Sequence, residues 1–199
     1  MTAPVTPPAS EAHLVVVPGQ LRFGPRVDGF DRAADALLER LRGNPVTDLL
    51  FSTATHLGDF SVIWHLAGVT RGILLRRPDQ VVVLAGLLGA ESLVVNQGVK
   101  RLFRRERPTT DGDARLRVRR PSTSAFPSGH ASSAVFAASI LSMWDGRRSR
   151  PLWFGIAAVV AVSRAYVRIH HASDVVGGAV VGIVLGRLGS RVARRLAPT

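Results

Sequence analysis

Five apolar stretches of nearly membrane-spanning length constrain the fold of this 199-residue chain. They cover residues 49–70, 80–98, 128–144, 151–165 and 174–190. A helix that crosses a bilayer needs about 20 mainly apolar residues, and several of these stretches are at the short end of that range. Buried helices of a soluble all-α protein would give a similar pattern, but five are more than one soluble core of this size would use. The sequence therefore predicts an all-α, polytopic membrane helix bundle with about five transmembrane helices.

The segment before these stretches predicts a tail and an amphipathic helix. Residues 1–27 are rich in proline and lack a clear period, which is typical of a flexible N-terminal tail. Residues 28–43 follow a helical period and lie on the membrane surface or on the other helices. The apolar face consists of Phe30, Ala33, Ala34, Leu37, Leu38 and Leu41. We divide the chain into the tail and one membrane domain, residues 28–199.

The charge is strongly positive and almost entirely due to arginine. The chain has 26 basic and 14 acidic residues, a net charge of +12, and a single lysine, Lys100. Cysteine is absent, so a disulfide framework, a thiolate zinc site and a cysteine nucleophile are excluded. A high positive charge fits nucleic-acid binding, phosphorylated substrates or arginine-rich membrane loops. Because the cations cluster between the apolar stretches, membrane loops are favoured and no nucleic-acid partner is expected.

Polar residues inside the apolar stretches indicate a polar interior. Asp59, Glu91 and Asn96 are candidates for inward-facing positions, because ionisable groups at membrane depth are costly unless they face such an interior. Placement near helix ends at the interface is the alternative.

Glycines in the fifth stretch indicate close helix packing. Gly178, Gly182 and Gly186 repeat every four residues, which gives a small face that another membrane helix can approach. Chance is the alternative, because glycine is common in this chain.

The first candidate cluster lies in a basic loop, residues 100–124. This loop contains nine cations and three acidic residues, and a solvated face or contact with anionic lipid headgroups explains the arginines from Arg115 to Arg120. Lys100 and Arg107 are seven residues apart, which would place both on one face if the preceding helix continues to Pro108. Two such cations can bind one phosphate.

The second cluster starts the third stretch. Pro127-Ser128-Gly129-His130 predicts a helix N-terminus with free backbone N–H groups, which is suited to an anion. His130 can exchange a proton near neutral pH. An ordinary helix cap is the alternative reading of this tetrapeptide.

The third cluster combines Ser163-Arg164 with His170 and Asp174. One helical turn would bring His170 and Asp174 together, so that the carboxylate fixes the imidazole tautomer and frees the other nitrogen to attack. The alternatives are a helix cap by Ser173 or Asp174 and a histidine–carboxylate metal site. The surrounding arginines disfavour a metal ion. If the five stretches cross a membrane, all three clusters meet at one face.

These three clusters resemble the signature of the type-2 phosphatidic acid phosphatase family, which includes the vanadium-dependent haloperoxidases. The pattern K-x6-R-P is matched by Lys100 and Arg107-Pro108, and P-S-G-H by residues 127–130. The pattern S-R-x5-H-x3-D is matched by Ser163-Arg164, His170 and Asp174. The matches span residues 100–174, and the helical pattern extends the resemblance to about 50–190.

The resemblance implies an integral-membrane lipid phosphatase that needs no metal and no cofactor and forms a phosphohistidine. His170 would be the nucleophile, Asp174 would support it, and His130 would protonate the leaving oxygen. The residues that would bind the phosphate are Lys100, Arg107, Ser128, Gly129 and Arg164. The substrate would be a polyprenyl phosphate or diphosphate, a phosphorylated polyprenyl sugar, phosphatidic acid or phosphatidylglycerol phosphate.

Three alternatives and two structural questions accompany this reading. The alternatives are a vanadate-dependent haloperoxidase, a lipid-linked phosphotransferase and a non-enzymatic binder of anions. Many members of the family have six membrane helices, whereas this chain shows five and an amphipathic segment. Ten arginines flank the stretches on the face opposite the clusters, so the positive-inside rule favours a multi-pass protein of the cell membrane with an extracytoplasmic site.

Overall fold

The computed structural model of the chain describes residues 23–108, 116, 118 and 123–199, and the regular structure within these residues is helical throughout. The predicted tail, apart from residues 23–27, and residues 109–115, 117 and 119–122 of the basic loop lie outside the described residues. The seven α-helices are α1 (Pro25–Glu39), α2 (Pro45–Gly58), α3 (Val62–Leu74), α4 (Pro78–Leu93), α5 (Gly129–Asp145), α6 (Arg150–Tyr166) and α7 (Ala172–Leu196).

Proline fixes where four of these helices start. Pro25, Pro45, Pro78 and Pro151 each occupy the first turn of their helix. Proline is preorganised for that position, and the N–H that it lacks would have no partner there. The amphipathic helix therefore begins at Pro25 rather than at residue 28, so the boundary predicted for the tail is a few residues too late.

One helix was predicted for the first apolar stretch, residues 49–70, but the structure divides it into two. The α-helix stops at Gly58, and α3 begins at Val62 after one short turn, Asp59–Ser61. Phe60 and Ser61 have φ angles of 52° and 60°, which break the helix. Such left-handed conformations cost about 1–3 kcal/mol each and are often found at functional sites. Here the break presents Asp59 to the interior of the bundle.

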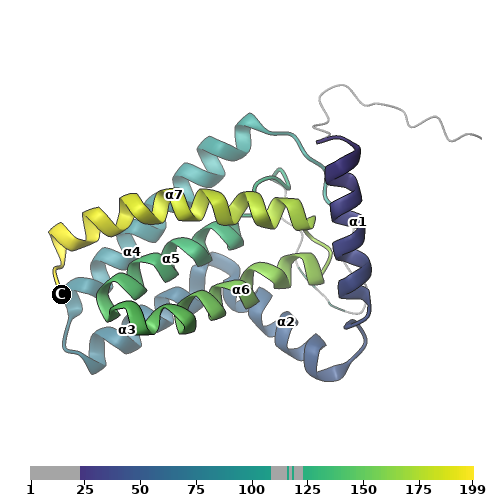
Figure 1. Cartoon of the computed structure of the whole chain (residues 1–199). Coiled ribbons are helices and arrows are strands. Elements are labelled where there is room, and N and C mark those ends of the chain that lie inside the picture. Colours follow the sequence, from purple (N-terminus) through teal and green to yellow (C-terminus); the bar gives the residue numbers. More distant parts are fainter. Residues whose placement is uncertain (1–22, 109–115, 117, 119–122) are drawn as a thin grey trace, which may run out of the picture.

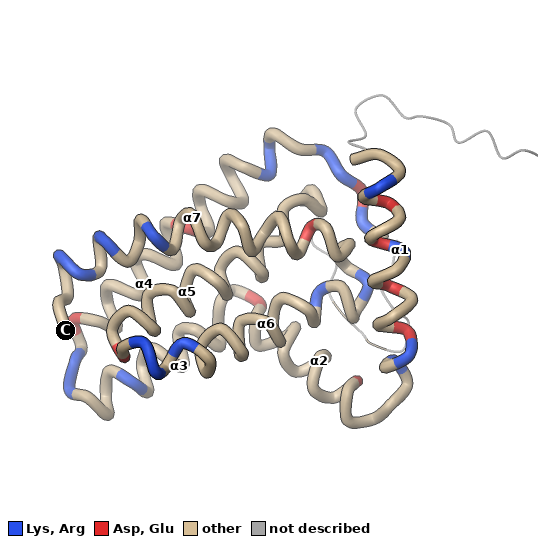
Figure 2. Tube along the Cα trace, viewed as in Figure 1, with Lys and Arg blue, Asp and Glu red and all other residues tan. Residues whose placement is uncertain are grey.

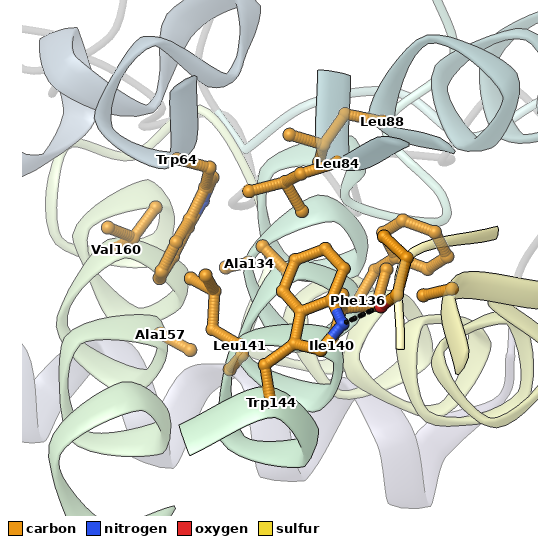
Figure 3. Close-up of a cluster of buried hydrophobic side chains, with 14 residues drawn as sticks. Trp64, Leu84, Leu88, Ala134, Phe136, Ile140, Leu141, Trp144, Ala157 and Val160 are labelled. Atoms are coloured by element: carbon orange, nitrogen blue, oxygen red, sulfur yellow. Dashed lines mark hydrogen bonds between the residues drawn. The ribbon is translucent and has the colours of Figure 1, made fainter. Parts of the chain in front are cut away.

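Helix α5 lies at the centre of the bundle, with α4, α6 and α7 packed around it (Figure 1). Figure 3 shows the buried cluster formed by side chains of these helices and α3, including Trp64, Leu84, Phe136 and Trp144. The indole N–H of Trp144 donates a hydrogen bond of 2.9 Å to the Ala197 carbonyl and so ties α5 to the end of α7.

The glycine face of α7 packs directly on α5, as the sequence predicted. A Cβ atom added at Gly178 would lie 2.3 Å from the Ser128 carbonyl oxygen, and one at Gly182 would lie 2.5 Å from that of Ser132. At Gly186 the nearest atom is Oγ of Ser139, at 2.7 Å. These distances are too short for any side chain, so the glycines allow the two backbones to approach.

Helix α1 crosses the end of the bundle where α6 ends and α7 begins (Figure 1). The face that packs on the bundle carries acidic and apolar residues: Asp31 is buried, Asp35 pairs with Arg42 and Arg168, and Leu38 packs against a buried cluster that includes Tyr166. Phe30, Leu37 and Leu41 remain 41–60% exposed. The predicted apolar face is therefore divided between the bundle and the surface.

Within the described residues, two helices have the length and hydropathy needed to cross a membrane. They are Pro78–Leu102, in which α4 continues through two short helical segments, and Ala172–Leu196, each of 25 residues. Helices α5 and α6 have 17 residues each. The helical class that the sequence predicted is confirmed, whereas the number of crossings stays a prediction.

Candidate active site

A cavity of about 610 Å³ opens where the three sequence clusters meet. It lies between the break after α2, the end of the α4 segment, the start of α5 and the end of α6. Its polar lining includes Lys100, Gly129, His130, Arg164 and His170, one or more residues from each cluster. The sequence prediction that the clusters converge is consistent with this arrangement.

The two cations of the first cluster, Lys100 and Arg107, lie on different kinds of backbone. Lys100 lies in a short helical turn, is 8% exposed, and its Nζ donates to Thr123 Oγ1 at 3.3 Å. The helix ends at Leu102, and Phe103 is extended, so the prediction that one helix face carries both cations is wrong. Arg107 arrives through this extended segment and donates to the carbonyls of Ile169 and Thr123, both at 3.0 Å.

The second cluster forms a helix N-terminus, as predicted. Ser128 is the N-cap of α5, and its hydroxyl accepts from the Ala131 N–H at 3.5 Å. Gly129 follows, close to Lys100: a Cβ atom there would lie 3.5 Å from Nζ. Ser128 is fully buried and already caps the helix, so the capping alternative from the sequence describes part of what this residue does.

His130, in the first turn of α5, has a carboxylate partner from outside the signature motifs. Its Nε2 lies 2.9 Å from Oδ1 of Asp59, which the break after α2 presents to the cavity. Sequence reasoning placed Asp59 inward together with Glu91 and Asn96, and all three line the cavity. It did not identify the partner, because nothing in the spacing of residues 59 and 130 links them.

Arg164, in the last turn of α6, has donors available for an anion. The residue is fully buried. One nitrogen, Nη1, donates to Thr55 Oγ1 at 2.5 Å and lies 3.9 Å from Asp59 Oδ1. Within the described part of the chain, Nε and Nη2 have no hydrogen-bond partner. Buried donors without partners are costly, and an anion in the cavity would satisfy them.

His170 lies before α7 rather than on it. His171 caps that helix, and the Asp174 carboxylate accepts from the His171 N–H at 2.8 Å, so the predicted capping role is present. Nδ1 of His170 is 3.6 Å from Oδ2 of Asp174, just beyond hydrogen-bonding distance. Its Nε2 is 3.1 Å from Nη1 of Arg107. His170 and Asp174 are therefore adjacent, as predicted. However, His170 precedes α7, so the two residues do not lie one turn apart on the same helix.

Burial and positive charge keep the His170 imidazole neutral. Burial, together with the charges of Arg107 and Arg164, lowers the pKa of His170 to about 3, although the Asp174 carboxylate acts in the opposite direction. Because the charged form is disfavoured in the folded protein, the ring stays unprotonated throughout the physiological pH range. A neutral ring retains the lone pair that nucleophilic attack requires.

The described residues contain no group of three or more histidine and acidic side chains that could hold a metal ion. The positive charge around the cavity comes from Lys100, Arg107 and Arg164 instead. Such a set of fixed cations is suited to holding the oxygens of a phosphate.

Comparison with known proteins identifies the family. Residues 80–197 match the model of the PAP2 superfamily, so the chain belongs to this superfamily. A decaprenylphosphoryl-5-phosphoribose phosphatase of Mycobacterium tuberculosis is 32% identical over 136 residues, which cover 67% of this chain and 73% of the relative. The resemblance found in the three motifs is thereby confirmed.

Two solved structures share the fold. A transmembrane PAP2-type phosphatidylglycerolphosphate phosphatase from Bacillus subtilis superposes with a TM-score of 0.67, covers 87% of this chain and 89% of its own, and is 22% identical. LpxE from Aquifex aeolicus gives a TM-score of 0.66 at 22% identity, with 86% and 99% coverage. The prediction of a membrane phosphatase agrees with the family and with these relatives.

Proposed function

We propose that this protein is a multi-pass membrane phosphatase that hydrolyses a phosphate monoester or a diphosphate of a lipid. The observation that carries the proposal is one cavity that Lys100, Arg164 and the motif histidines His130 and His170 all line. Two buried donors of Arg164 are left for an anion, and Nη1 of Arg107 lies 3.1 Å from Nε2 of His170. The Mycobacterium tuberculosis relative, named for a phosphorylated polyprenyl sugar, supports a substrate of that kind.

The cavity suits a molecule that is polar at one end and apolar at the other. Leu88 and Val95 of the α4 segment and Phe60 of the break line it together with the charged residues. Phe60 is 85% exposed, at a position where a lipid chain would leave the cavity. Burial of that ring against a lipid would be favourable, because apolar surface would leave water.

The proposed reaction has two steps. His170 attacks phosphorus, the bond between phosphorus and the lipid oxygen breaks, and His130 gives a proton to the departing oxygen. Water then attacks the phosphohistidine, gives a proton back to His130, and releases inorganic phosphate and free His170. Lys100, Arg107 and Arg164 would hold the phosphoryl oxygens, with Ser128 and the Gly129 backbone at the start of α5.

The carboxylates support the two histidines in this scheme. Asp174 lies beside Nδ1 of His170 and would stabilise the positive charge that develops on the ring. Asp59 holds His130 and would stabilise that ring when it carries the proton. Fixed cations supply the electrostatic role that metal ions have in many phosphatases, so we propose a metal-independent reaction.

The test is phosphate release by purified protein in detergent with EDTA present. A panel of polyprenyl phosphate, polyprenyl diphosphate, a phosphorylated polyprenyl sugar, phosphatidic acid and phosphatidylglycerol phosphate would identify the substrate. We expect His170→Ala to abolish turnover and His56→Ala, at an exposed position on α2, to retain it. Full activity of His170→Ala, or loss of wild-type activity in EDTA, would contradict the mechanism.

A further inference from the structure

Arg105 is a buried arginine to which the proposed mechanism gives no role. It links the carboxylate of Asp174 to helix α1. Nη1 of Arg105 donates to Oδ1 of Asp174 at 2.5 Å, and Nη2 donates to Oδ2 of Asp31 at 2.7 Å. The side chains of Arg105, Asp31 and Asp174 are 7%, 7% and 0% exposed. One guanidinium thus joins two carboxylates from opposite ends of the chain.

A serine at the start of α7 closes this network. The Ser173 N–H donates to Oδ1 of Asp31 at 2.8 Å, and its hydroxyl donates to Oδ2 at 2.7 Å. Nη1 of Arg105 also donates to this hydroxyl oxygen, at 2.7 Å. The ring of Phe23 lies 4.8 Å below the guanidinium carbon. Each buried polar group therefore has partners, which is the condition under which such a network is rigid.

The contacts of Asp174 show what the network controls. Oδ1 faces Arg105, whereas Oδ2 accepts from the His171 N–H and lies 3.6 Å from Nδ1 of His170. Arg105 and the helix cap thus determine which oxygen faces the nucleophile. Asp31 has a second effect, because it shares the charge of Arg105. Without that sharing the full positive charge would act on Asp174 and weaken it as an acceptor for His170.

We propose that Asp31 and Arg105 are positioning residues, through which the docking of α1 sets the orientation and basicity of Asp174 at the nucleophile. The inference rests on the proposed function. It makes α1 part of the active site through Asp31, which bonds to Arg105 and Ser173. It adds two residues to the reaction that the three motifs do not contain.

Helix α1 offers a matched control for this proposal. Asp35 lies one turn after Asp31 on the same face and also pairs with arginines, Arg42 and Arg168. Neither arginine forms an ion pair with Asp174 in the described structure. Asp35→Asn therefore removes an equal charge and a docking contact on the same face, at a side chain that is 47% rather than 7% exposed, but leaves the link to Asp174 in place.

The experiment compares Asp31→Asn, Asp31→Glu and Asp35→Asn, with the lipid phosphate that wild-type protein cleaves fastest. We expect Asp31→Asn to lower kcat at least about tenfold, while KM and the inhibition constant of inorganic phosphate change less than about twofold. Asp31→Glu keeps the charge and should recover most of the loss. Asp35→Asn should remain within about twofold of wild type.

The outcomes separate positioning from folding and from the proposed function. A normal inhibition constant for phosphate shows that the variant is folded and that its cations are intact. Equal effects of Asp31→Asn and Asp35→Asn, or a fall in kcat together with lost phosphate affinity, would overturn the positioning role. Wild-type protein that cleaves none of the lipids would overturn the proposed function itself.

Discussion

Each of the two histidines at the cavity has a carboxylate partner, but the two pairs are built differently. His130 contacts Asp59 directly, at 2.9 Å, and the acid comes from a strained break 71 residues earlier in the chain. His170 lies 3.6 Å from Asp174, whose other contacts are Arg105 and a helix cap. The nucleophile thus has a carboxylate that is itself held in place, which suits a group whose orientation decides the reaction.

The lone lysine gives a prediction at this scale. Lys100 is buried, and a Cβ atom at Gly129 would lie 3.5 Å from its Nζ, so the compact ammonium lies close to the start of α5. We expect Lys100→Arg to lower kcat about 100-fold despite its retained charge, as removal of one donor to the transition state does. Arg101→Lys, which changes an exposed neighbour bonded to Gln97, is the control. Near-normal turnover of Lys100→Arg would show that the position needs only charge.

Asp59 gives a second prediction. Asp59→Asn keeps the size of the side chain but removes the charge that stabilises a protonated His130. We expect a fall of about 10- to 100-fold in kcat for the lipid and a smaller fall for p-nitrophenyl phosphate, whose leaving group needs no proton. Asp79→Asn, at the exposed pair with Arg77, should leave both rates unchanged. Equal losses on both substrates would contradict a role in proton transfer.

The sequence could predict the motif residues and the pair of His170 and Asp174, but not the partners that come from outside the motifs. Lys100, His130, Arg164 and His170 were identified because each falls in a short pattern with fixed spacing. Asp59 could be placed inward, since a charge inside an apolar stretch is itself a signal. Arg105 carried no such signal, because it is one of nine cations in a loop and its partner Asp31 is 74 residues away.

At the scale of elements, the packing of α5 on α7 decides where the second and third motifs meet. The glycine face lets α7 approach so closely that the Asp174 carbonyl accepts from the Ser128 N–H at 3.0 Å. This backbone bond joins the caps of the two helices that carry His130 and Asp174. The sequence could predict this close packing, because glycines that repeat every four residues lie on one face of a helix.

This packing predicts a large effect of one methyl group. Gly182→Ala would place Cβ 2.5 Å from the Ser132 carbonyl, where backbone and not a flexible side chain must move. We expect a loss of about 1–3 kcal/mol in stability, measured as a lower Tm in detergent. Gly86→Ala in α4 is the control, since no atom lies within 4 Å of the added Cβ. An unchanged Tm for Gly182→Ala would mean that α7 can shift away from α5 without cost.

The periodicity of the sequence did not determine the structure of two elements, for different reasons. The break at residues 59–61 was missed because Phe60 and Ser61 adopt left-handed backbone without glycine or proline to mark it. The orientation of α1 was open because its acidic face finds Arg42, Arg105 and Arg168, and only the tertiary fold brings these together. A helical period shows that two faces differ but not which face meets the protein.

At the scale of the whole molecule, charge is distributed unequally between the two ends of the bundle. Figure 2 shows Arg segments gathered at the end that holds the C-terminus, whereas acidic and basic segments alternate at the α1 end. The arginines at the far end are Arg71, Arg76, Arg77, Arg147, Arg148, Arg150, Arg187, Arg191, Arg194 and Arg195. Those at the α1 end include Arg42, Arg105 and Arg168, which are ion-paired.

This asymmetry supports the proposal that the active site faces away from the cytoplasm. Cytoplasmic loops carry an excess of arginine and lysine near the ends of membrane helices. The turns between α3 and α4 and between α5 and α6 have that character, and both lie at the end remote from the cavity (Figure 1). Some of the cations near the cavity are instead explained by ion pairs, as for Arg42, Arg105 and Arg168, or by the phosphate that the motif cations are proposed to bind.

Single cysteines can test this orientation cleanly, because the chain has none of its own. Arg40→Cys follows α1 at the cavity end, and Arg148→Cys lies in the turn at the other end; both positions are exposed. With a membrane-impermeant maleimide we expect intact cells to label Arg40→Cys at once and Arg148→Cys only after permeabilisation. The reason is that the dense arginine end is retained in the cytoplasm. The reverse pattern would place the site inside, and labelling of both positions in intact cells would contradict a fixed orientation.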